Sequence, residues 1–552
     1  MNNLYWMKMN IIILLFLNFF YVILTWRCGA DQLKIKPGIL NITKEEKKRR
    51  LSSYYTPIKI KADYSNLKIT DSVNSATLQK IKNLIDETCN EFSKFLKVQH
   101  INVGLFNSEE LIKEQCEIDS IGADFGNYLI ENDIIIFPSF DSELGGGVLA
   151  AAGLCLYNAD NLRPFGGILL INPELSFSKK NTDLYMKNLL FHELTHVLVF
   201  NPELMKELGM TNTKIFDGSF VTFVNSPRVL TAARQHFNCT TLNGIPLENQ
   251  GSEGSAGSHW EARYMLSDYM ISTDYIDAVL SDITLALFED SGFYKVEYYS
   301  GGLFKYGKNM GCSFFEKKCI ENANTDFKNE FCININEDFC SRTRAVKGQC
   351  LIYHHTDSIP SRYQYFEDKK NGGFKPANYC PVSNIEDSDR DYYPTSCHAG
   401  TSYLNSDYGE KISDSSFCFI SSLLPYNSSQ SSKNQAICYQ VECDKNNKQI
   451  IVNIGNNKVV CPSEGGTITN PNGFSGKIDC PEYNEICGFD SEDNSICNEM
   501  FDCIKKGIET DVNTFSYFPD EDDDFNKIVI KTISEKFKIN FTLIFLLLLF
   551  YI

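Results

Sequence analysis

The feature that most constrains this chain is the pentapeptide at residues 192–196, which reads His-Glu-Leu-Thr-His. Side chains four residues apart on an α-helix project from the same face, so His192 and His196 can bind one zinc ion. Catalysis by zinc needs three protein ligands, an open position for water and a carboxylate that accepts the water's proton. The pentapeptide therefore supplies two candidate ligands and a candidate general base, Glu193, and it requires a helix at this point of the fold.

The sequence around the pentapeptide predicts that helix and a sheet for it to pack on. Residues 182–200 predict a helix that buries one side and keeps the two histidines together, with apolar positions at Leu184, Leu189, Leu190, Leu194, Val197 and Leu198. Helical spacing predicts another helix over 75–98, and apolar stretches predict strands at 55–64, 101–106, 132–137 and 166–171. Strands followed by the 182–200 helix predict an α+β fold with a mixed sheet.

The size and charge of the chain limit its class and its partners. With 552 residues, 43% of them hydrophobic, it has the length of roughly two to four domains and enough apolar material for large cores. Its 52 basic and 70 acidic residues give a net charge of −18, which disfavours nucleic acid or an anionic membrane surface as an electrostatic partner. We therefore expect a folded protein that binds no nucleic acid.

The cysteines are concentrated in the C-terminal part of the chain. Fifteen of the 20 lie between Cys312 and Cys503, and their spacings lack the repeated C-x-x-C pairs of zinc ribbons. This density is typical of disulfides formed in an oxidising compartment. Residues 311–518 are therefore predicted to form a cysteine-rich region, whose short strands rely on disulfides more than on one large core.

The N-terminal residues look like targeting and processing segments. Residues 1–28 are expected to be a secretory signal peptide, because 11–26 are almost wholly apolar and follow a short segment that contains Lys8. Residues 29–50 are expected to be a prosegment, since they end in a basic run at 47–50 where a processing protease could cut.

The C-terminal residues, 519–552, combine an acidic linker with an apolar tail. The tail, at 539–552, is shorter than the about twenty residues that span a bilayer. It is predicted to be either the removed signal of a GPI anchor or a tail anchor, which would place the protein in the secretory pathway and then at the cell surface or outside the cell. Candidate glycan acceptors in a secreted chain are Asn41, Asn238 and Asn427.

A zinc ion held by the pentapeptide needs a third ligand from the other histidines, which are His100, His236, His259, His354, His355 and His398. The segment Gly-Ser-His-Trp at 257–260 contains His259, and Met270 follows eleven residues later. A methionine in a tight turn after the last ligand is the mark of the metzincin peptidases. The sequence resembles the leishmanolysin (GP63) family of metzincins, in which a long insertion separates the motif helix from such a segment. Short segments similar to the family's sequence lie at 163–167, 285–294, 307–312, 473–476 and 480–481, so the resemblance runs from about Tyr55 to Cys503.

The resemblance implies a metzincin-like catalytic domain over 51–310, with an insertion between His196 and His259. It implies that His192, His196 and His259 bind one Zn²⁺ per chain, that Glu193 is the catalytic base and that Met270 is the Met-turn residue. The alternative third ligand is His236.

The resemblance also implies two features outside the metal ligands. In such proteins a prosegment cysteine can block the open zinc position as a thiolate, which makes Cys28 a candidate latch. By analogy with metzincins, the strand at 166–171 is either a substrate-pairing strand along the cleft or a plain core or edge strand.

Two positions depart from the family pattern. Val199 stands where the family has glycine, and a β-branched residue with positive φ is disfavoured by roughly 1–2 kcal/mol or more. Either the turn shifts toward Asn201 and Pro202, or the site is distorted. After Met270 the chain has Ile271 where a proline is expected.

The sequence thus predicts a zinc-dependent endopeptidase that hydrolyses peptide bonds in proteins at the cell surface or outside the cell. The alternative is a catalytically inert surface adhesin of the same family, which the unusual Val199 motivates. Such an adhesin would have no chemical need for Glu193.

Overall fold

The computed structural model describes residues 51–487, apart from the internal segments 102–108, 124–130, 145–147, 159–160, 177–182, 217–218, 251–255, 274, 276–277, 297–303, 336, 385–395, 399–407 and 429–432. It also describes two short N-terminal strands, β1 (Arg27–Cys28) and β2 (Gly38–Leu40). The rest of the predicted signal peptide and prosegment, Asn41 and the whole C-terminal tail at 519–552 lie outside the described residues.

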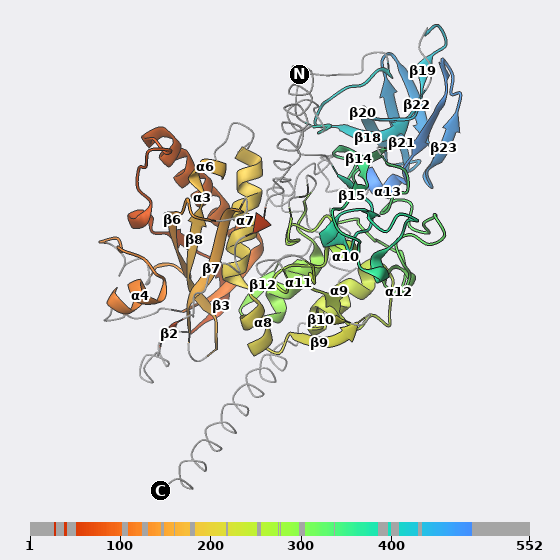
Figure 1. The fold of residues 1–552 in the computed structure, drawn as a ribbon. Helices are drawn as coiled ribbons and strands as arrows, with labels where there is room; N and C mark the ends of the chain where they lie inside the picture. The colour runs from red at the N-terminus through yellow and green to blue at the C-terminus, as the bar shows by residue number, and fades with distance from the viewer. Residues whose placement is uncertain are drawn as a thin grey trace, which may run out of the picture.

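A mixed sheet forms the N-terminal part of the fold (Figure 1). Its strand order is β1-β7-β8-β6-β4, and β2 also pairs with β7. Strands β7 and β8 are antiparallel, while the other pairs are parallel. The bounds are β4 (Ile60–Ala62), β6 (Ile134–Phe140), β7 (Val148–Asn158) and β8 (Pro164–Ile171). The expected mixed sheet is therefore confirmed.

Both faces of this sheet are covered. Along β6, Ile134 and Ile136 belong to the largest core cluster, whereas Ile135 and Phe137 belong to another. Alternate residues of a strand face opposite sides, so each face has its own apolar layer. On the first face lie α3 (Ser75–Phe95) and α7 (Asp183–Leu198), which contact each other, and on the second lies α4 (Glu109–Gln115). Such double coverage explains why β6 and β8 read as almost continuous apolar runs.

Gly167 in β8 sets how closely α7 approaches the sheet. A Cβ atom at this position would lie 2.3 Å from Cγ1 of Val197, the residue that follows His196. A larger side chain would push the helix away from the sheet, because packed interiors have no spare volume.

Three predicted elements differ in their bounds. The helix expected over 75–98 ends at Phe95, because Leu96 begins β5 (Leu96–Ile101), which pairs with β3 (Leu51–Pro57) and β12 (Tyr294–Val296). Of the strand expected at 101–106, residue 101 ends β5, and the remaining residues lie outside the described part of the chain. The strand expected at 55–64 is two strands in different sheets, β3 and β4, since the chain turns where the Lys59 amide bonds Asp133 Oδ2 at 3.0 Å.

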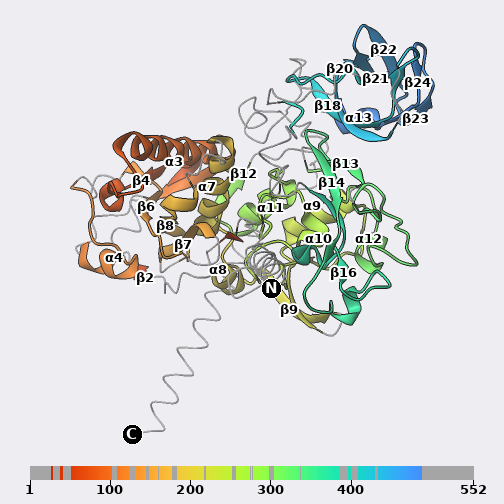
Figure 2. The ribbon, with the colours of Figure 1, turned by 45° about the horizontal axis from the view of Figure 1, so that its top comes forward.

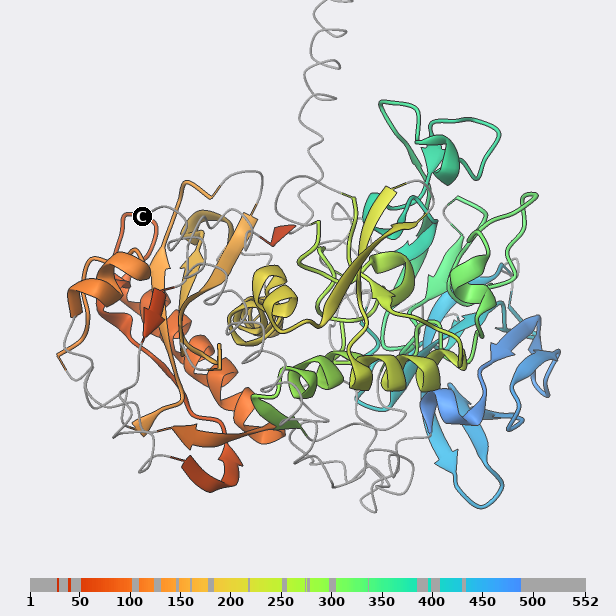
Figure 3. The ribbon, with the colours of Figure 1, turned by 90° about the horizontal axis from the view of Figure 1, so that it is seen from below.

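Between α7 and residue 310 the chain builds smaller elements around the end of that helix. Figure 3 shows α7 lying between the N-terminal sheet and these later segments. Strands β9, β10 and β11 form an antiparallel sheet, and α9 packs on α11. The bounds are α8 (Pro202–Glu207), β9 (Thr211–Phe216), β10 (Ser219–Val224), α9 (Pro227–Phe237), β11 (Ile245–Pro246), α10 (Ala262–Met265) and α11 (Asp282–Asp290).

The C-terminal part contains a six-stranded antiparallel sheet of order β22-β21-β20-β18-β25-β23 at one end of the molecule (Figure 2). Its strands are β18 (Ser416–Ser421), β20 (Gln435–Asp444), β21 (Gln449–Ile454), β22 (Asn457–Cys461), β23 (Gly466–Thr469) and β25 (Lys477–Cys480). The C-terminal part also contains two short helices, α12 (Ser313–Glu316) and α13 (Tyr483–Ile486). Its remaining strands are small: β13 (Asp338–Cys340), β14 (Lys347–Leu351), β15 (Tyr353–His354), β16 (Asn371–Gly372), β17 (Val382–Asn384), β19 (Leu424–Pro425) and β24 (Phe474–Ser475).

The described residues contain two large apolar clusters, several smaller ones and eight disulfides. The largest core cluster runs from Ile58 to Val382, and a separate cluster lies within 408–487. The predicted domain boundary near residue 310 therefore does not coincide with a break in the packing, and the C-terminal sheet has an apolar core of its own. Eight disulfides join cysteines of the described residues, six of them within 319–487, which confirms the disulfide framework. Among the described helices, none has the length and apolar character needed to cross a membrane.

Candidate metal centre

The helix α7 carries the pentapeptide in its last turns. His192, Glu193 and His196 are all at most 2% exposed. From Leu189 to Leu198 every residue is buried, so this half of the helix is enclosed on all sides and not on one side as its spacing predicts. The reason is that α7 packs on β7 and β8 on one side, while the segment 256–273, hereafter the third-ligand segment, lies against the other and is buried from Ser258 onward.

The third-ligand segment brings His259 to the two histidines of α7. The Nε2 atom of His192 lies 3.2 Å from Nε2 of His259 and 3.1 Å from Nε2 of His196. The candidate ligand atoms of all three residues lie within 4.8 Å of one another. The alternative third ligand, His236, lies elsewhere, because its Nε2 donates to the carbonyl of Tyr306 at 2.8 Å.

Each of the three imidazoles uses its other nitrogen to bond a local group. The Nδ1 of His192 donates to the carbonyl of Tyr269 at 2.6 Å, and the Nδ1 of His196 donates to the carbonyl of Phe200 at 2.8 Å. A carbonyl only accepts, so these rings carry their proton on Nδ1 and leave the Nε2 lone pair toward the cluster. The Nδ1 of His259 lies 2.9 Å from Ser258 Oγ.

The environment of the histidines favours their neutral, ligating form. Burial, reinforced by His196 and His259, holds the pKa of His192 well below its usual value, and burial lowers the pKa of His196 to about 4. Neutral imidazoles are the form that binds metal. Three neutral imidazole nitrogens with oriented outer partners are a donor set that fits zinc.

Glu193 lies between α7 and the sheet. Its Oε2 accepts a hydrogen bond of 2.9 Å from the backbone amide of Ala152 in β7, and its side chain is fully buried. This bond fixes the orientation of the carboxylate beside the histidines of its own helix.

The turn after α7 puts no backbone strain on Val199. The amides of Val199 and Phe200 both bond the carbonyl of Thr195, at 3.0 and 2.9 Å, and Val199 is fully buried without a positive φ. Asn201 then caps α8, its side chain accepting from the amide of Leu204 at 3.0 Å. The chain therefore turns at Asn201 and Pro202, as the first of the two expected outcomes, and no strain falls on Val199.

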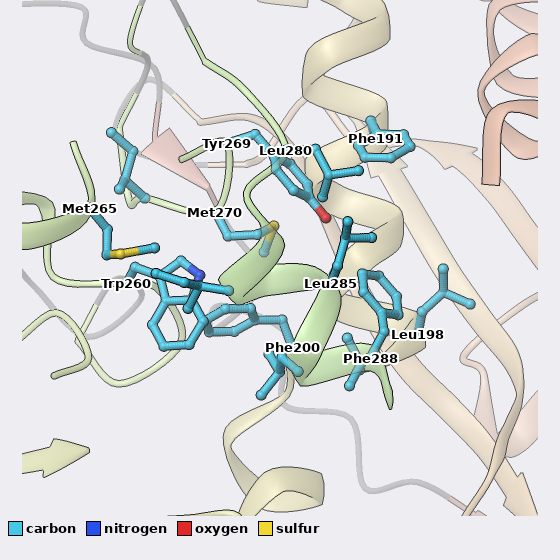
Figure 4. Close-up of a cluster of buried hydrophobic side chains, with 14 of the residues drawn as sticks. Phe191, Leu198, Phe200, Trp260, Met265, Tyr269, Met270, Leu280, Leu285 and Phe288 are labelled. Atoms are coloured by element: carbon cyan, nitrogen blue, oxygen red, sulfur yellow. The ribbon is translucent and has the colours of Figure 1, made fainter. Parts of the chain in front are cut away.

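Met270 lies in a buried turn whose hydrogen bonds sequence reasoning missed. The amide of Trp260 bonds the carbonyl of Met270 at 2.9 Å, which joins the residue after His259 to this turn. Asp268 accepts from the Met270 amide at 2.8 Å and from Thr284 Oγ1 at 2.7 Å. Figure 4 shows Met270 near Trp260 and Tyr269 in a cluster of buried hydrophobic side chains. The one sequence signal for Asp268 is its place two residues before Met270, a spacing at which an aspartate can bond the backbone.

Two further predicted features, Cys28 and the strand at 166–171, belong to the N-terminal sheet on which α7 packs. Strand β1 places Cys28 opposite Ala150 of β7, in a parallel pairing two residues from Ala152. Of the two interpretations of the strand at 166–171, the structure bears out the core strand and not the substrate-pairing strand, because β8 is central, with β6 on one side and β7 on the other. The outer edge of β7 is the one that pairs with β1 and β2.

Comparison with known proteins agrees with this arrangement. The family model described as Leishmanolysin matches residues 42–494. The chain is 27% identical over 465 residues to leishmanolysin from Leishmania tropica, covering 81% of this chain and 64% of that protein. It is 28% identical over 425 residues to leishmanolysin from Leishmania major, covering 74% and 68%. The leishmanolysin-like peptidase of Drosophila melanogaster is 28% identical over 304 residues, covering 49% and 44%. The chain thus spans about two thirds of the Leishmania relatives and under half of the fly relative.

Proposed function

Because this chain belongs to the leishmanolysin family, we propose that it is a zinc-dependent endopeptidase that hydrolyses peptide bonds in proteins at the cell surface or outside the cell. The observation that carries the proposal is the convergence of three buried Nε2 atoms, from His192, His196 and His259, beside the carboxylate-bearing residue Glu193. One Zn²⁺ held by these nitrogens would polarise the scissile carbonyl and lower the pKa of an attacking water.

Glu193 is the proposed general base. Its carboxylate accepts the proton of the attacking water and passes it to the leaving amine. The bond from the Ala152 amide supports this role, because it holds one carboxylate oxygen in place. Met270 would help to position His259, because its carbonyl accepts from the amide of the next residue, Trp260. Met270 itself would not touch substrate.

The outer edge of β7 is the proposed place of the substrate backbone. An extended peptide can add a strand to a free sheet edge, and β7 would be the edge strand once β1 and β2 leave. Of the two strands that hold this edge, β2 lies in the predicted prosegment and β1 at the end of the predicted signal peptide, so removal of both would open the edge. Cys28 would add a thiolate latch on the open metal position.

The remaining proposals concern organisation and location. A catalytic domain over 51–310 and a cysteine-rich region over 311–518 remain our division of the chain. The disulfides support passage through an oxidising compartment. Attachment to a membrane by the C-terminal tail, through a GPI anchor or a tail anchor, completes the proposed surface location.

The test is digestion of casein by the secreted, matured protein with and without a zinc chelator, beside the variant Glu193→Gln. We expect the chelator to abolish cleavage, and the variant to retain zinc but lose about 10²–10⁴-fold in rate. Activity that survives the chelator, or full activity of the variant, would contradict the mechanism. A folded, zinc-loaded wild type without activity would favour the inert adhesin. The strain at Val199 that suggested this alternative is absent, because Val199 has no positive φ.

A further inference from the structure

Tyr269, the residue before Met270, contacts α7 at two points. Its backbone carbonyl accepts the Nδ1 proton of His192 at 2.6 Å, and its hydroxyl oxygen lies 2.9 Å from Oγ1 of Thr195. Its ring also packs on Phe191, with 5.0 Å between the centroids. Figure 4 shows the Tyr269 side chain reaching from the Met270 turn toward α7. One residue outside the helix thus bonds both halves of the pentapeptide.

The direction of the hydroxyl bond follows from the other partner of Thr195. Thr195 Oγ1 also lies 2.9 Å from the carbonyl of Phe191, one turn earlier in α7. A carbonyl can only accept, so the Thr195 proton goes to Phe191 and the Tyr269 hydroxyl donates to Thr195. Both side chains are buried, with Thr195 fully enclosed and Tyr269 4% exposed, so water cannot replace either bond without opening the core.

The same turn also holds the third ligand. The carbonyl of Met270 accepts from the amide of Trp260, which directly follows His259. Tyr269 therefore connects the helix that carries two of the histidines to the segment that carries the third. A rotation of α7 about its axis would separate their Nε2 atoms, and the Thr195 bond opposes that rotation.

We propose that Tyr269 and Thr195 are positioning residues, whose side-chain hydrogen bond fixes the rotation of α7 so that His192 and His196 point at the same place as His259. This inference rests on the proposed zinc site. In this proposal neither side chain contacts the metal or the substrate. Both act through the histidines that they orient. The outer partner of His192 is the Tyr269 carbonyl, and loss of such a partner typically weakens metal binding by about 10–100-fold. Because the hydroxyl bond acts on the histidines only through the rotation of α7, its loss is expected at the lower end of this range.

The experiment measures the zinc dissociation constant of the full-length chain by competition with a chromophoric chelator. Tyr269→Phe and Thr195→Val should each bind zinc about 10-fold more weakly or worse, and the visible spectrum of the Co²⁺-substituted protein should shift. The double variant should be little weaker than either single variant, because both remove the same bond. Thr195→Ser keeps the hydroxyl and should restore the wild-type constant.

Two buried residues provide matched controls. Thr88 in α3 also donates its hydroxyl to the carbonyl one turn earlier, Leu84, at 2.7 Å. Tyr439 in β20 donates its hydroxyl to Ser421 Oγ at 3.1 Å, far from the site. Thr88→Val and Tyr439→Phe lose equivalent bonds and should bind zinc like the wild type.

The proposal is overturned if Tyr269→Phe binds zinc like the wild type, if the control variants weaken binding equally, or if the two site variants are additive. Zinc binding is measured without substrate. A wild type that binds zinc but cleaves no protein would therefore remove the proposed function and leave this inference standing.

Discussion

Two segments bring their histidines to one point, but different interactions hold them there. The helix α7 is a regular element whose last turns are enclosed by apolar side chains. Within the third-ligand segment, regular helix is limited to α10, and buried hydrogen bonds to Asp268 and Met270 fix the rest of the path. A helix spacing can be read directly from a sequence, whereas a path fixed by buried polar groups depends on partners that come from other parts of the chain.

Removal of one ligand from each segment should show that both are required. His192→Ala and His259→Ala should each weaken zinc binding by more than about 100-fold, which exceeds the loss expected for an outer partner. His236→Ala should keep full zinc content, because His236 bonds Tyr306 away from the cluster. Metal analysis of the purified variants checks this. Zinc loss in His236→Ala with retention in His259→Ala would reverse our assignment of the third ligand.

The polar support of the third-ligand segment should be visible in the pH dependence of stability. Burial raises the pKa of Asp268 from 3.8 to about 6. Between these values the folded state binds more protons than the unfolded state, so this carboxyl lowers the free energy of unfolding as the pH rises from about 4 to about 6. Asp268→Asn should therefore gain about 3 kcal/mol on the wild type across that window.

Urea unfolding of metal-free protein at several pH values measures this gain without any contribution from zinc release. Asp444 is the control, because hydrogen bonds from Asn447 lower its pKa, so Asp444→Asn should show no gain of this sign. If the free energy of unfolding changed with pH in the same way in the wild type and in Asp268→Asn, the pKa of Asp268 would not be raised in the folded protein.

The end of α7 should respond to loss of packing rather than to relief of strain. Val199 is fully buried and lacks a positive φ, so Val199→Gly removes apolar contact and adds backbone freedom to the unfolded chain. We expect a loss of about 2–3 kcal/mol in the free energy of unfolding, with zinc content unchanged. If chemical denaturation showed the glycine variant to be more stable, the turn would need a left-handed residue at this position.

The smallest effect is expected at the cap that follows this turn. Asn201→Ala removes the side-chain bond to the Leu204 amide and should cost about 1 kcal/mol of stability. Asn74→Ala removes the equivalent cap of α3, where the side chain accepts from Thr77 at 2.9 Å. Both should lower the melting temperature, but Asn201→Ala alone should weaken zinc binding, because Asn201 follows the Phe200 carbonyl that orients His196. Equal zinc affinity in the two variants would show that the Asn201 cap does not contribute to zinc binding.

Sequence reasoning reached the parts of the site that have a fixed spacing. The bounds of α7 and the proximity of His192 to His196 follow from helix geometry, while His259 and Met270 needed the resemblance to a family. The carbonyls of Tyr269 and Phe200 could not be found, because every residue has a carbonyl and only the folded path selects one. The spacing of Asp268 to Met270 allows a backbone bond, but the sequence does not show that Thr284 is the second partner of Asp268. For the same reason, apolar patterning located the strand at 164–171 but could not show that it is central, since core and edge strands share that pattern.

The three-histidine site can be tested directly with a crystal structure of the zinc-loaded protein and anomalous scattering data collected at the zinc edge. We expect one anomalous peak about 2.0–2.1 Å from Nε2 of each of His192, His196 and His259. A peak coordinated by His236 or by other side chains, or no peak between the three rings in zinc-saturated crystals, would contradict it.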